Sequence, residues 1–176
     1  MVGLLLVLPA LLLASPSSAP WPCPRPIIGR ADVVACIGLS GTALAPLGGD
    51  SLEVRIWREG ALTGLSLTRA LRVHGVWAVT TYFGSRRASA LTVNEDATPQ
   101  SWADRWPAAL AAGLDTLPPE PAIVPSLPRS DGESVTVEWT AGASVREVRS
   151  NRPLRCTNPS DRTLAAALDT LGLSLC

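Results

Sequence analysis

Residues 51–57 read SLEVRIW, and the alternation of apolar and polar side chains in this stretch decides the fold class. In an extended chain the even-numbered apolar residues fall on one side, while Glu53 and Arg55 fall on the other. This period of two is typical of a β-strand with one buried face. The same pattern returns at 134–140, SVTVEWT, and 76–83, VWAVTTYF, adds the β-branched and aromatic residues that strands favour. We therefore expect an antiparallel sheet.

Three further segments complete a sheet of about six strands, namely 61–69, 88–93 and 143–149. A turn at 58–60 should separate the first two strands. Two amphipathic helices are expected at 104–117 and 159–171, each with a leucine stripe, an N-cap residue and a proline in its first turn. The sequence thus predicts an α+β fold with both helices on one face of the sheet and a single shared core.

The two expected helices resemble each other. Residues 109–118 read ALAAGLDTLP and residues 163–172 read TLAAALDTLG, so seven of ten positions are identical. The strands at 51–57 and 134–140 that precede them also correspond. One interpretation is a duplicated hairpin-plus-helix unit, and the alternative is coincidence in a chain rich in alanine and leucine. A duplication predicts that the two leucine stripes occupy equivalent places in the fold.

Composition excludes several classes of function. The 176 residues carry 15 basic and 15 acidic side chains, and this zero net charge argues against nucleic acid or anionic lipid as the main partner. All basic residues are arginine, which excludes a lysine Schiff base, and the single histidine excludes a multi-histidine metal site. No glycine motif that cradles a phosphate is present, so we expect neither a cofactor nor a metal.

The N-terminus indicates export. Residues 2–13 form an apolar run of twelve that is too short to span a membrane, and small residues follow it, so we interpret 1–19 as a secretory signal peptide. The alternative is a buried N-terminal helix or strand. Residues 20–176 would then form a single globular domain, secreted or periplasmic, with a proline-rich connector at 118–128.

Four cysteines agree with export, because an even number in an exported chain favours disulfides. The candidates are Cys23, Cys36, Cys156 and Cys176. Short separation favours the pairs Cys23–Cys36 and Cys156–Cys176. The rival pair Cys36–Cys156 would tie the two ends of the chain together. Buried free thiols are the further alternative.

Candidate catalytic residues are few. The segment 38–42, GLSGT, is one glycine short of a nucleophile elbow, so a serine hydrolase would use Ser40 with His74, the lone histidine. His74 precedes Gly75 in an expected turn between strands, where an exposed histidine with no catalytic role is the simpler interpretation. The acidic residues are scattered along the chain and form no evident pair across a cleft.

Six tryptophans stand beside one phenylalanine and one tyrosine. Tryptophan is enriched at binding surfaces, but in a chain with so few other aromatic residues it also has to fill the core. Trp57 lies opposite the apolar side of its strand, and Trp77 lies opposite Val76 in the same way. Both are therefore candidate exposed binding aromatics.

One stretch resembles a known family. Residues 54–73, VRIWREGALTGLSLTRALRV, resemble the opening hairpin of emfourin-type inhibitors of thermolysin-like metalloproteases. The resemblance covers twenty residues, and this chain has Gly60-Ala61 where the family's doubled glycine is expected. It implies an inhibitor of secreted metalloproteases.

The leading functional hypothesis is an exported, non-enzymatic binding or structural module, because no convergent catalytic set is evident in the sequence. Its partner would be an extracytoplasmic macromolecule. The alternatives are the metalloprotease inhibitor and the serine hydrolase.

Overall fold

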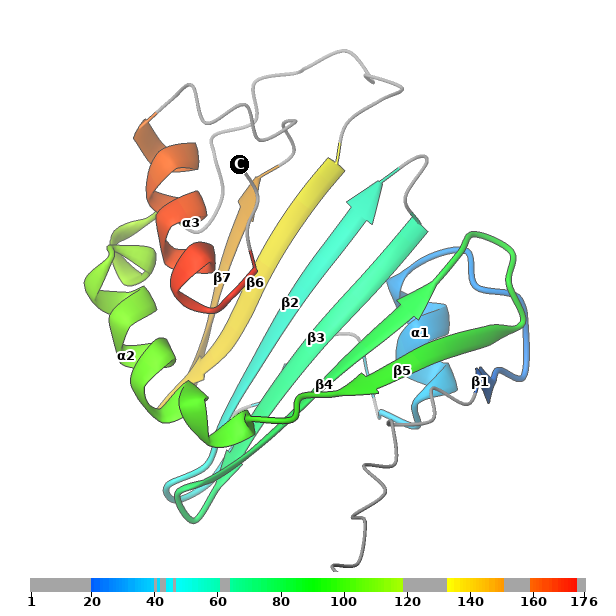
Figure 1. The fold of residues 1–176 in the computed structure, drawn as a ribbon, viewed down its shortest axis with the longest axis horizontal. Helices are drawn as coiled ribbons and strands as arrows, with labels where there is room; N and C mark the ends of the chain where they lie inside the picture. Colours follow the sequence, from blue (N-terminus) through cyan, green and yellow to red (C-terminus); the bar gives the residue numbers. More distant parts are fainter. Residues whose placement is uncertain are drawn as a thin grey trace, which may run out of the picture.

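The alternating segments pair into one antiparallel sheet, as predicted (Figure 1). The computed structural model describes residues 20–39, 41, 44–45, 47–60, 64–118, 133–150 and 159–173. In this part of the chain the sheet has seven strands in the order β1-β5-β4-β3-β2-β6-β7. The strands are β1 (Pro20–Pro22), β2 (Leu52–Gly60), β3 (Gly64–Val73), β4 (Val76–Gly84), β5 (Ala90–Glu95), β6 (Glu133–Ala141) and β7 (Ser144–Ser150). The α+β class is confirmed.

The seventh strand, β1, was not predicted. Its three residues pair with β5 at the edge of the sheet, with Trp21 opposite Leu91. Pro20 and Pro22 have no backbone N–H, and an edge strand tolerates them because one of its sides needs no ladder partner. The turn expected at 58–60 is also absent, since β2 continues to Gly60 and pairs there with Gly64.

Two helices cover one face of the sheet, as predicted. They are α2 (Trp102–Ala111) and α3 (Pro159–Thr170), and both lie in front of the β6–β7 side in Figure 1. We call this the helix-pair face. Its core joins the even-numbered residues of β2 to the helices, and its central members are Val54, Ile56, Trp77, Trp102, Trp106, Val137, Trp139, Leu164 and Leu168.

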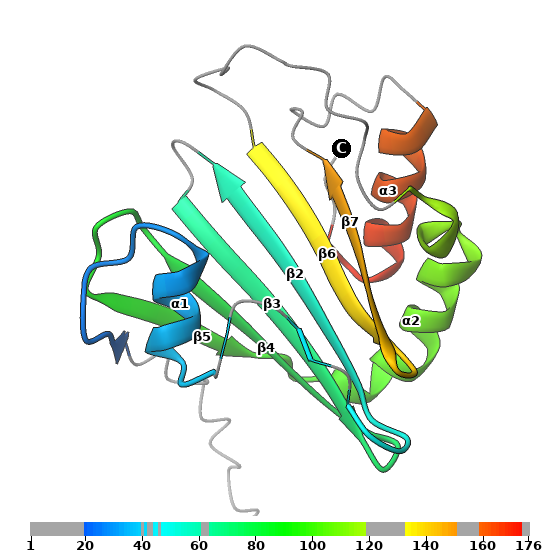
Figure 2. The same cartoon turned by 180° about the vertical axis from the view of Figure 1, so that it is seen from behind.

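The opposite face has its own cover, the short helix α1 (Arg30–Cys36), which lies over β4 and β5 in Figure 2. We call this the α1 face. Val33 and Val34 of α1 pack there against Trp57, Leu67 and other buried side chains. The helix was not predicted, because seven residues are too few to show a helical period. Its first turn is fixed by Asp32, whose Oδ2 accepts hydrogen bonds from the backbone N–H groups of Ile28 (2.9 Å) and Gly29 (3.0 Å).

The helix expected at 104–117 is divided. After 3-10 helix η1 (Pro99–Ser101), α2 begins at Trp102 and ends at Ala111, and a 3-10 helix, η2 (Leu114–Thr116), follows. Gly113 separates the two with a φ of 101°, a backbone conformation that glycine adopts without strain. Asp104, the N-cap residue expected for this helix, therefore lies inside the helix rather than at its cap.

The two leucine stripes reach the same core. Leu114 and Leu117 on one side, and Leu168 and Leu171 on the other, all belong to the cluster on the helix-pair face. The threonines of the shared Asp-Thr pair also make the same local contact: Thr116 Oγ1 donates to the Gly113 carbonyl and Thr170 Oγ1 donates to the Ala167 carbonyl, each at 2.7 Å. The internal duplication stays a prediction that these likenesses favour.

A disulfide joins Cys23 to Cys36, with their Cα atoms 4.8 Å apart. The local pairing is thus confirmed for the first two cysteines, and the rival pair Cys36–Cys156 is wrong. The bond connects the segment after β1 to the end of α1, so it cross-links the two segments that cover the α1 face. Cys156, Cys176, the expected signal peptide 1–19 and the connector from 119 onward lie outside the described residues.

Candidate functional site

The charged side chains of the α1 face form the first candidate site. Glu53 and Arg55 are each only 5% exposed, although both are charged. Glu53 Oε1 accepts hydrogen bonds from Arg55 Nε at 2.9 Å and from Arg69 Nε at 2.7 Å. Burial raises the pKa of Glu53, but the bonds and charges of Arg69 and Arg55 outweigh it and hold that pKa below its ordinary value. Glu53 is therefore a fixed carboxylate within a structural cluster.

Arg30 connects α1 to this cluster. Its guanidinium donates to Glu59 and, through Nη2, to Thr136 Oγ1 at 2.6 Å, and it lies 5.3 Å from the centre of the Trp57 ring. Its Nη1 is also 3.6 Å from Glu138 Oε1. These contacts hold the first residue of α1 against the sheet, which explains how so short a helix stays in place.

Glu138 differs from Glu53. Burial raises the pKa of Glu138 above its ordinary value, and the hydrogen bond from Trp57 Nε1 at 3.4 Å and the charge of Arg30 only partly oppose this. The acceptor bonds of Glu138 are longer than those of Glu53, and its partners are shared with other groups. The α1 face thus holds two buried glutamates whose pKa values move in opposite directions.

The prediction that Trp57 and Trp77 are exposed is wrong, since they are 0% and 3% exposed. The side of β2 that carries Trp57 is covered by α1 and its neighbours, so both faces of this strand are buried. In β4 the two sides are exchanged relative to our expectation. Val76 is 62% exposed, whereas Trp77 packs on Trp102 of α2 with ring centroids 5.9 Å apart. Neither tryptophan presents a surface.

The histidine lies where the sequence placed it. His74 and Gly75 form the exposed turn between β3 and β4, with φ values of 50° and 77°, as in the two-residue turns that favour glycine. Ser40 lies outside the described residues, so its pairing with His74 stays a prediction. Within the described ranges, no group of three or more histidine, cysteine or acidic residues could hold a metal ion.

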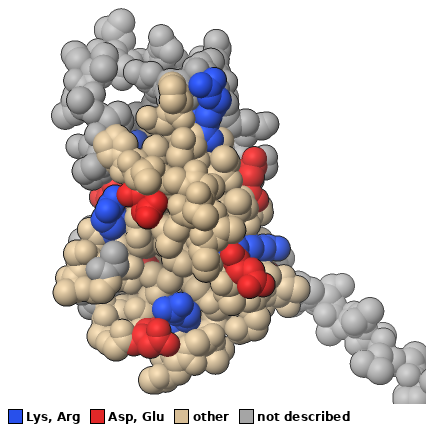
Figure 3. All heavy atoms as spheres, turned by 90° about the vertical axis from the view of Figure 1, so that its left-hand side faces the viewer, with Lys and Arg blue, Asp and Glu red and all other residues tan. Residues whose placement is uncertain are grey.

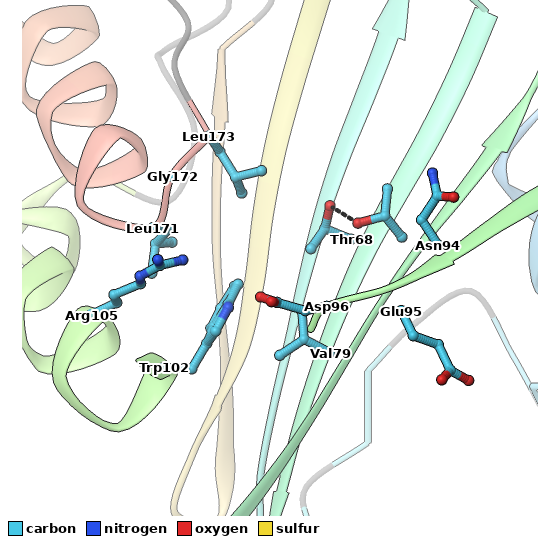
Figure 4. A pocket seen from close by; sticks show the side chains of 11 residues that line it. Thr68, Val79, Asn94, Glu95, Asp96, Trp102, Arg105, Leu171, Gly172 and Leu173 are labelled. Carbon is cyan, nitrogen blue, oxygen red and sulfur yellow. Dashed lines mark hydrogen bonds between the residues drawn. The ribbon is translucent and has the colours of Figure 1, made fainter. Parts of the chain in front are cut away.

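A groove on the helix-pair face forms the second candidate site. Here the helices leave the later part of β4 and part of β5 uncovered, and Phe83 (46% exposed) and the exposed Asn94 lie there. The groove has a volume of about 210 Å³ (Figure 4). Its polar and aromatic lining consists of Thr68, Thr81, Asn94, Glu95, Asp96, Trp102 and Arg105. This volume is below that of a pocket for a drug-sized molecule, so the groove fits a group the size of one amino-acid residue.

The groove differs from the α1 face in its electrostatics. Arg105 is half-buried and extends from α2 toward the groove, and it makes no hydrogen bond or ion pair in the described part of the chain (Figure 4). By contrast, Arg25, Arg30 and Arg72 each pair with a carboxylate. On the far wall, Thr68 and Thr81 share a hydrogen bond of 3.1 Å between their hydroxyl groups. The groove therefore combines this cation with two carboxylates, Glu95 and Asp96, and with neutral donors and acceptors.

The groove was not predicted from the sequence. Asp96 is one of the scattered acidic residues that form no evident pair, and Arg105 was not singled out. A signal was present in β3 and β4, because Thr68 and Thr81 occupy positions whose neighbours on the same face, Ala70 and Val79, are apolar. Polar side chains that interrupt a buried stripe indicate a place where the cover ends.

The surface on the side of the helix pair carries no large patch of one charge. Figure 3 shows acidic and basic side chains there in small mixed groups on a largely uncharged surface. None of the described helices combines the length and the apolar character that a membrane span requires. Comparisons with protein-family models, with curated proteins and with solved structures gave no significant match.

Proposed function

We propose that this protein acts outside the cytoplasm as a non-enzymatic binding module, and that the groove beside Arg105 receives part of its partner. The observation that carries the proposal is the half-buried guanidinium of Arg105, which pairs with no group among the described residues and lies where the helix layer ends. A charge that is partly removed from water gains most from a ligand that supplies its counter-charge. The charged cluster of the α1 face offers less, because its groups already satisfy one another.

Export is supported by two features. The apolar run at 2–13 has the length of a signal-peptide core, and the Cys23–Cys36 disulfide is typical of an oxidising compartment. The partner would thus be an extracytoplasmic macromolecule. Mass measurement of the protein recovered from its native host tests this. We expect a chain that lacks the leader, and an intact N-terminal Met1 would contradict export by this route.

Binding at the groove can be tested without knowing the partner. We suggest adding a tryptic digest of casein to the ¹⁵N-labelled protein and following backbone amide shifts. We expect shifts at Thr81, Asp96 and Arg105, and we expect Asn94→Trp, which places a large ring at the groove, to remove them. Glu147→Trp, on the exposed part of β7, is the matched control and should leave them unchanged. Absence of shifts at the groove, or shifts confined to other surfaces, would contradict the proposal.

A second candidate is the inhibitor of secreted metalloproteases. What favours it is that the described parts of the stretch that resembles the emfourin-type hairpin, 54–60 and 64–73, belong to the antiparallel strands β2 and β3, which pair with each other. Its end is tightly built: a Cβ at Gly64, where φ is 84°, would lie 2.6 Å from the Gly84 carbonyl oxygen. Residual activity of a thermolysin-like protease tests this role. No loss of activity at micromolar protein would end it.

A further inference from the structure

The arrangement of charge in the groove restricts what can bind there. Arg105 lies on one side, on α2, and two acidic residues, Glu95 and Asp96, lie on the other, at the end of β5 (Figure 4). Asp96 is held in place, since its backbone N–H donates to the Val79 carbonyl at 2.9 Å and its Oδ1 accepts from the Thr98 N–H at 2.8 Å. A ligand with an anionic group is therefore attracted at one wall and repelled at the other, which orients it.

The other polar groups of the groove, which lie beyond Asp96 as seen from Arg105 in Figure 4, are suited to neutral polar chemistry. Thr68 and Thr81 offer hydroxyl oxygens, and Asn94 offers an amide. The indole N–H of Trp102 has no hydrogen-bond partner in the described chain, so a second uncommitted donor lies on the Arg105 side. Guanidinium with a nearby N–H donor is a suitable pair for a carboxylate, which accepts two or more hydrogen bonds.

The two ends of the groove are lined differently. Leu171, Gly172 and Leu173, at the end of α3, line it near Arg105, and the exposed Asn94 lines it on β5 (Figure 4). A peptide can therefore enter over Asn94 and end at Arg105. Its last peptide N–H would then face the side that carries Asp96, where a hydrogen-bond donor is favoured.

We infer that the groove binds the C-terminal carboxylate of a peptide, with Arg105 as the carboxylate-binding residue and the last peptide group on the threonine and asparagine side. The inference deepens the proposed binding function and rests on it. A free amino acid presents the same carboxylate but carries an ammonium group in place of the peptide N–H.

The simplest other role for Arg105 is local. A Cβ at Gly172 would lie 3.4 Å from Arg105 Nη1, so the guanidinium is close to the C-terminal end of α3, where a cation is favourable. That role predicts a loss of stability when the charge is removed, but no preference between ligands.

The test compares acetyl-Ala-Ala-Leu with a free C-terminal carboxyl against the same peptide with a C-terminal amide. Titrations are followed by the Trp102 indole N–H signal. We expect the acid to bind about tenfold more tightly or better, since one charge-assisted bidentate contact is lost in the amide. Arg105→Gln should reduce the acid to the affinity of the amide. The matched control is Arg162→Gln, an exposed arginine of α3 that does not line the groove and should keep the preference.

Several outcomes would overturn the inference. They are equal binding of acid and amide, a preference that survives in Arg105→Gln, and no binding of either peptide at millimolar concentration. If Arg105→Gln does not fold, Arg105→Lys replaces it and should retain only part of the preference. Free leucine as a third ligand distinguishes a peptide C-terminus from a free amino acid as the source of the carboxylate. Tighter binding of leucine than of the peptide acid would overturn the inference that the ligand is a peptide. If the casein digest shifts the amide signals of the groove residues while the acid and the amide peptide bind equally, the proposed binding function stands and the inferred recognition of a carboxylate is wrong. If the digest also fails, both fall.

Discussion

The two faces of the sheet are both buried, but they are buried by different means. The helix-pair face is covered by two helices and filled with tryptophan, leucine and valine. The α1 face is covered by a single seven-residue helix, and much of what it buries is charged, with Glu53, Arg55 and Glu138 all less than 8% exposed. The short helix α1 is thus held on the sheet by hydrogen bonds, ion pairs and a disulfide. The larger helix pair is held there by the apolar area that it buries.

The same comparison separates a site from a scaffold. The α1 face holds the larger number of charged side chains, yet they bind one another and leave little for a ligand. The helix-pair face is mainly apolar, and at its margin lies Arg105, a half-buried cation that has no partner in the part of the chain that the structure describes. The number of charged groups is therefore a poorer guide to function than the presence of one that is not satisfied.

The largest expected effect comes from the apolar face. Trp102→Ala removes a side chain that is 1% exposed and packs on Trp77, and we expect it to lower the free energy of unfolding by about 3–5 kcal/mol. Urea denaturation measures this. Phe83→Ala, at an aromatic residue that is 46% exposed, is the control and should cost far less. Similar losses for both variants would contradict the assignment of Trp102 to the core.

The disulfide should matter mainly to the α1 face. Replacing both Cys23 and Cys36 by serine opens a link across a separation of 13 residues, and we expect a loss of about 3 kcal/mol. Hydrogen exchange shows where the loss appears. Amides of α1 should exchange faster, while those of α2 and α3 keep their protection. Equal loosening of all three helices would show that the two covers are not independent.

The two buried glutamates predict opposite dependences of stability on pH. Glu53 has a pKa below its ordinary value of 4.5, so its contribution is present above pH 4.5 and is lost as the pH falls through the lower, folded-state pKa. Glu138 has a raised pKa, so stability falls as the pH rises from 4.5 through its folded-state pKa. Each group changes stability by at most about 1.4 kcal/mol per pH unit.

Substitution separates these two contributions. In urea denaturation series across pH, Glu138→Gln should remove the decline above pH 4.5, and Glu53→Gln should flatten the rise at acidic pH. Because Glu53 accepts two arginine bonds, its variant also tests whether the fold survives without them. A decline that persists in Glu138→Gln would assign it to another group.

The smallest effect is expected outside both covers. Val73 and Val76 pair at the end of the β3–β4 hairpin and are 39% and 62% exposed. Val73→Thr and Val76→Thr should each change the free energy of unfolding by less than about 0.5 kcal/mol, because neither residue belongs to a buried cluster. Thermal unfolding is sufficient to measure this, and a larger loss would place a third packed region at this tip.

The sequence predicted the sheet well because its signal is local. Six of the seven strands follow from patterns within six to nine residues, and Asn158, Pro159 and Gly172 mark the second helix within a residue or two. The signal failed where structure depends on distant neighbours. Whether Trp57 is exposed depends on a helix twenty residues earlier, and alternation cannot show that a second cover exists.

The groove could not be predicted for a related reason. Its lining comes from β3, β4, β5, α2 and the end of α3, so no single stretch of sequence carries it. In the sequence, nothing distinguishes Arg105 from an ordinary surface arginine of an amphipathic helix. It becomes distinctive only because Gly172, after α3, lies close to it and no carboxylate of the described residues pairs with it, and both facts belong to the tertiary structure.

The strand that comes first in the described chain pairs with a strand that is made much later. β1 contacts only β5 within the sheet, so Pro20–Pro22 has no ladder partner until synthesis has passed residue 90. The cysteines at 23 and 36 are already available at that stage, and their separation is short enough for them to bond without the sheet. An early cross-link would therefore close residues 23–36, which include α1, into a loop before the sheet exists. This loop would then pack against the sheet as one unit, once the central strands are complete.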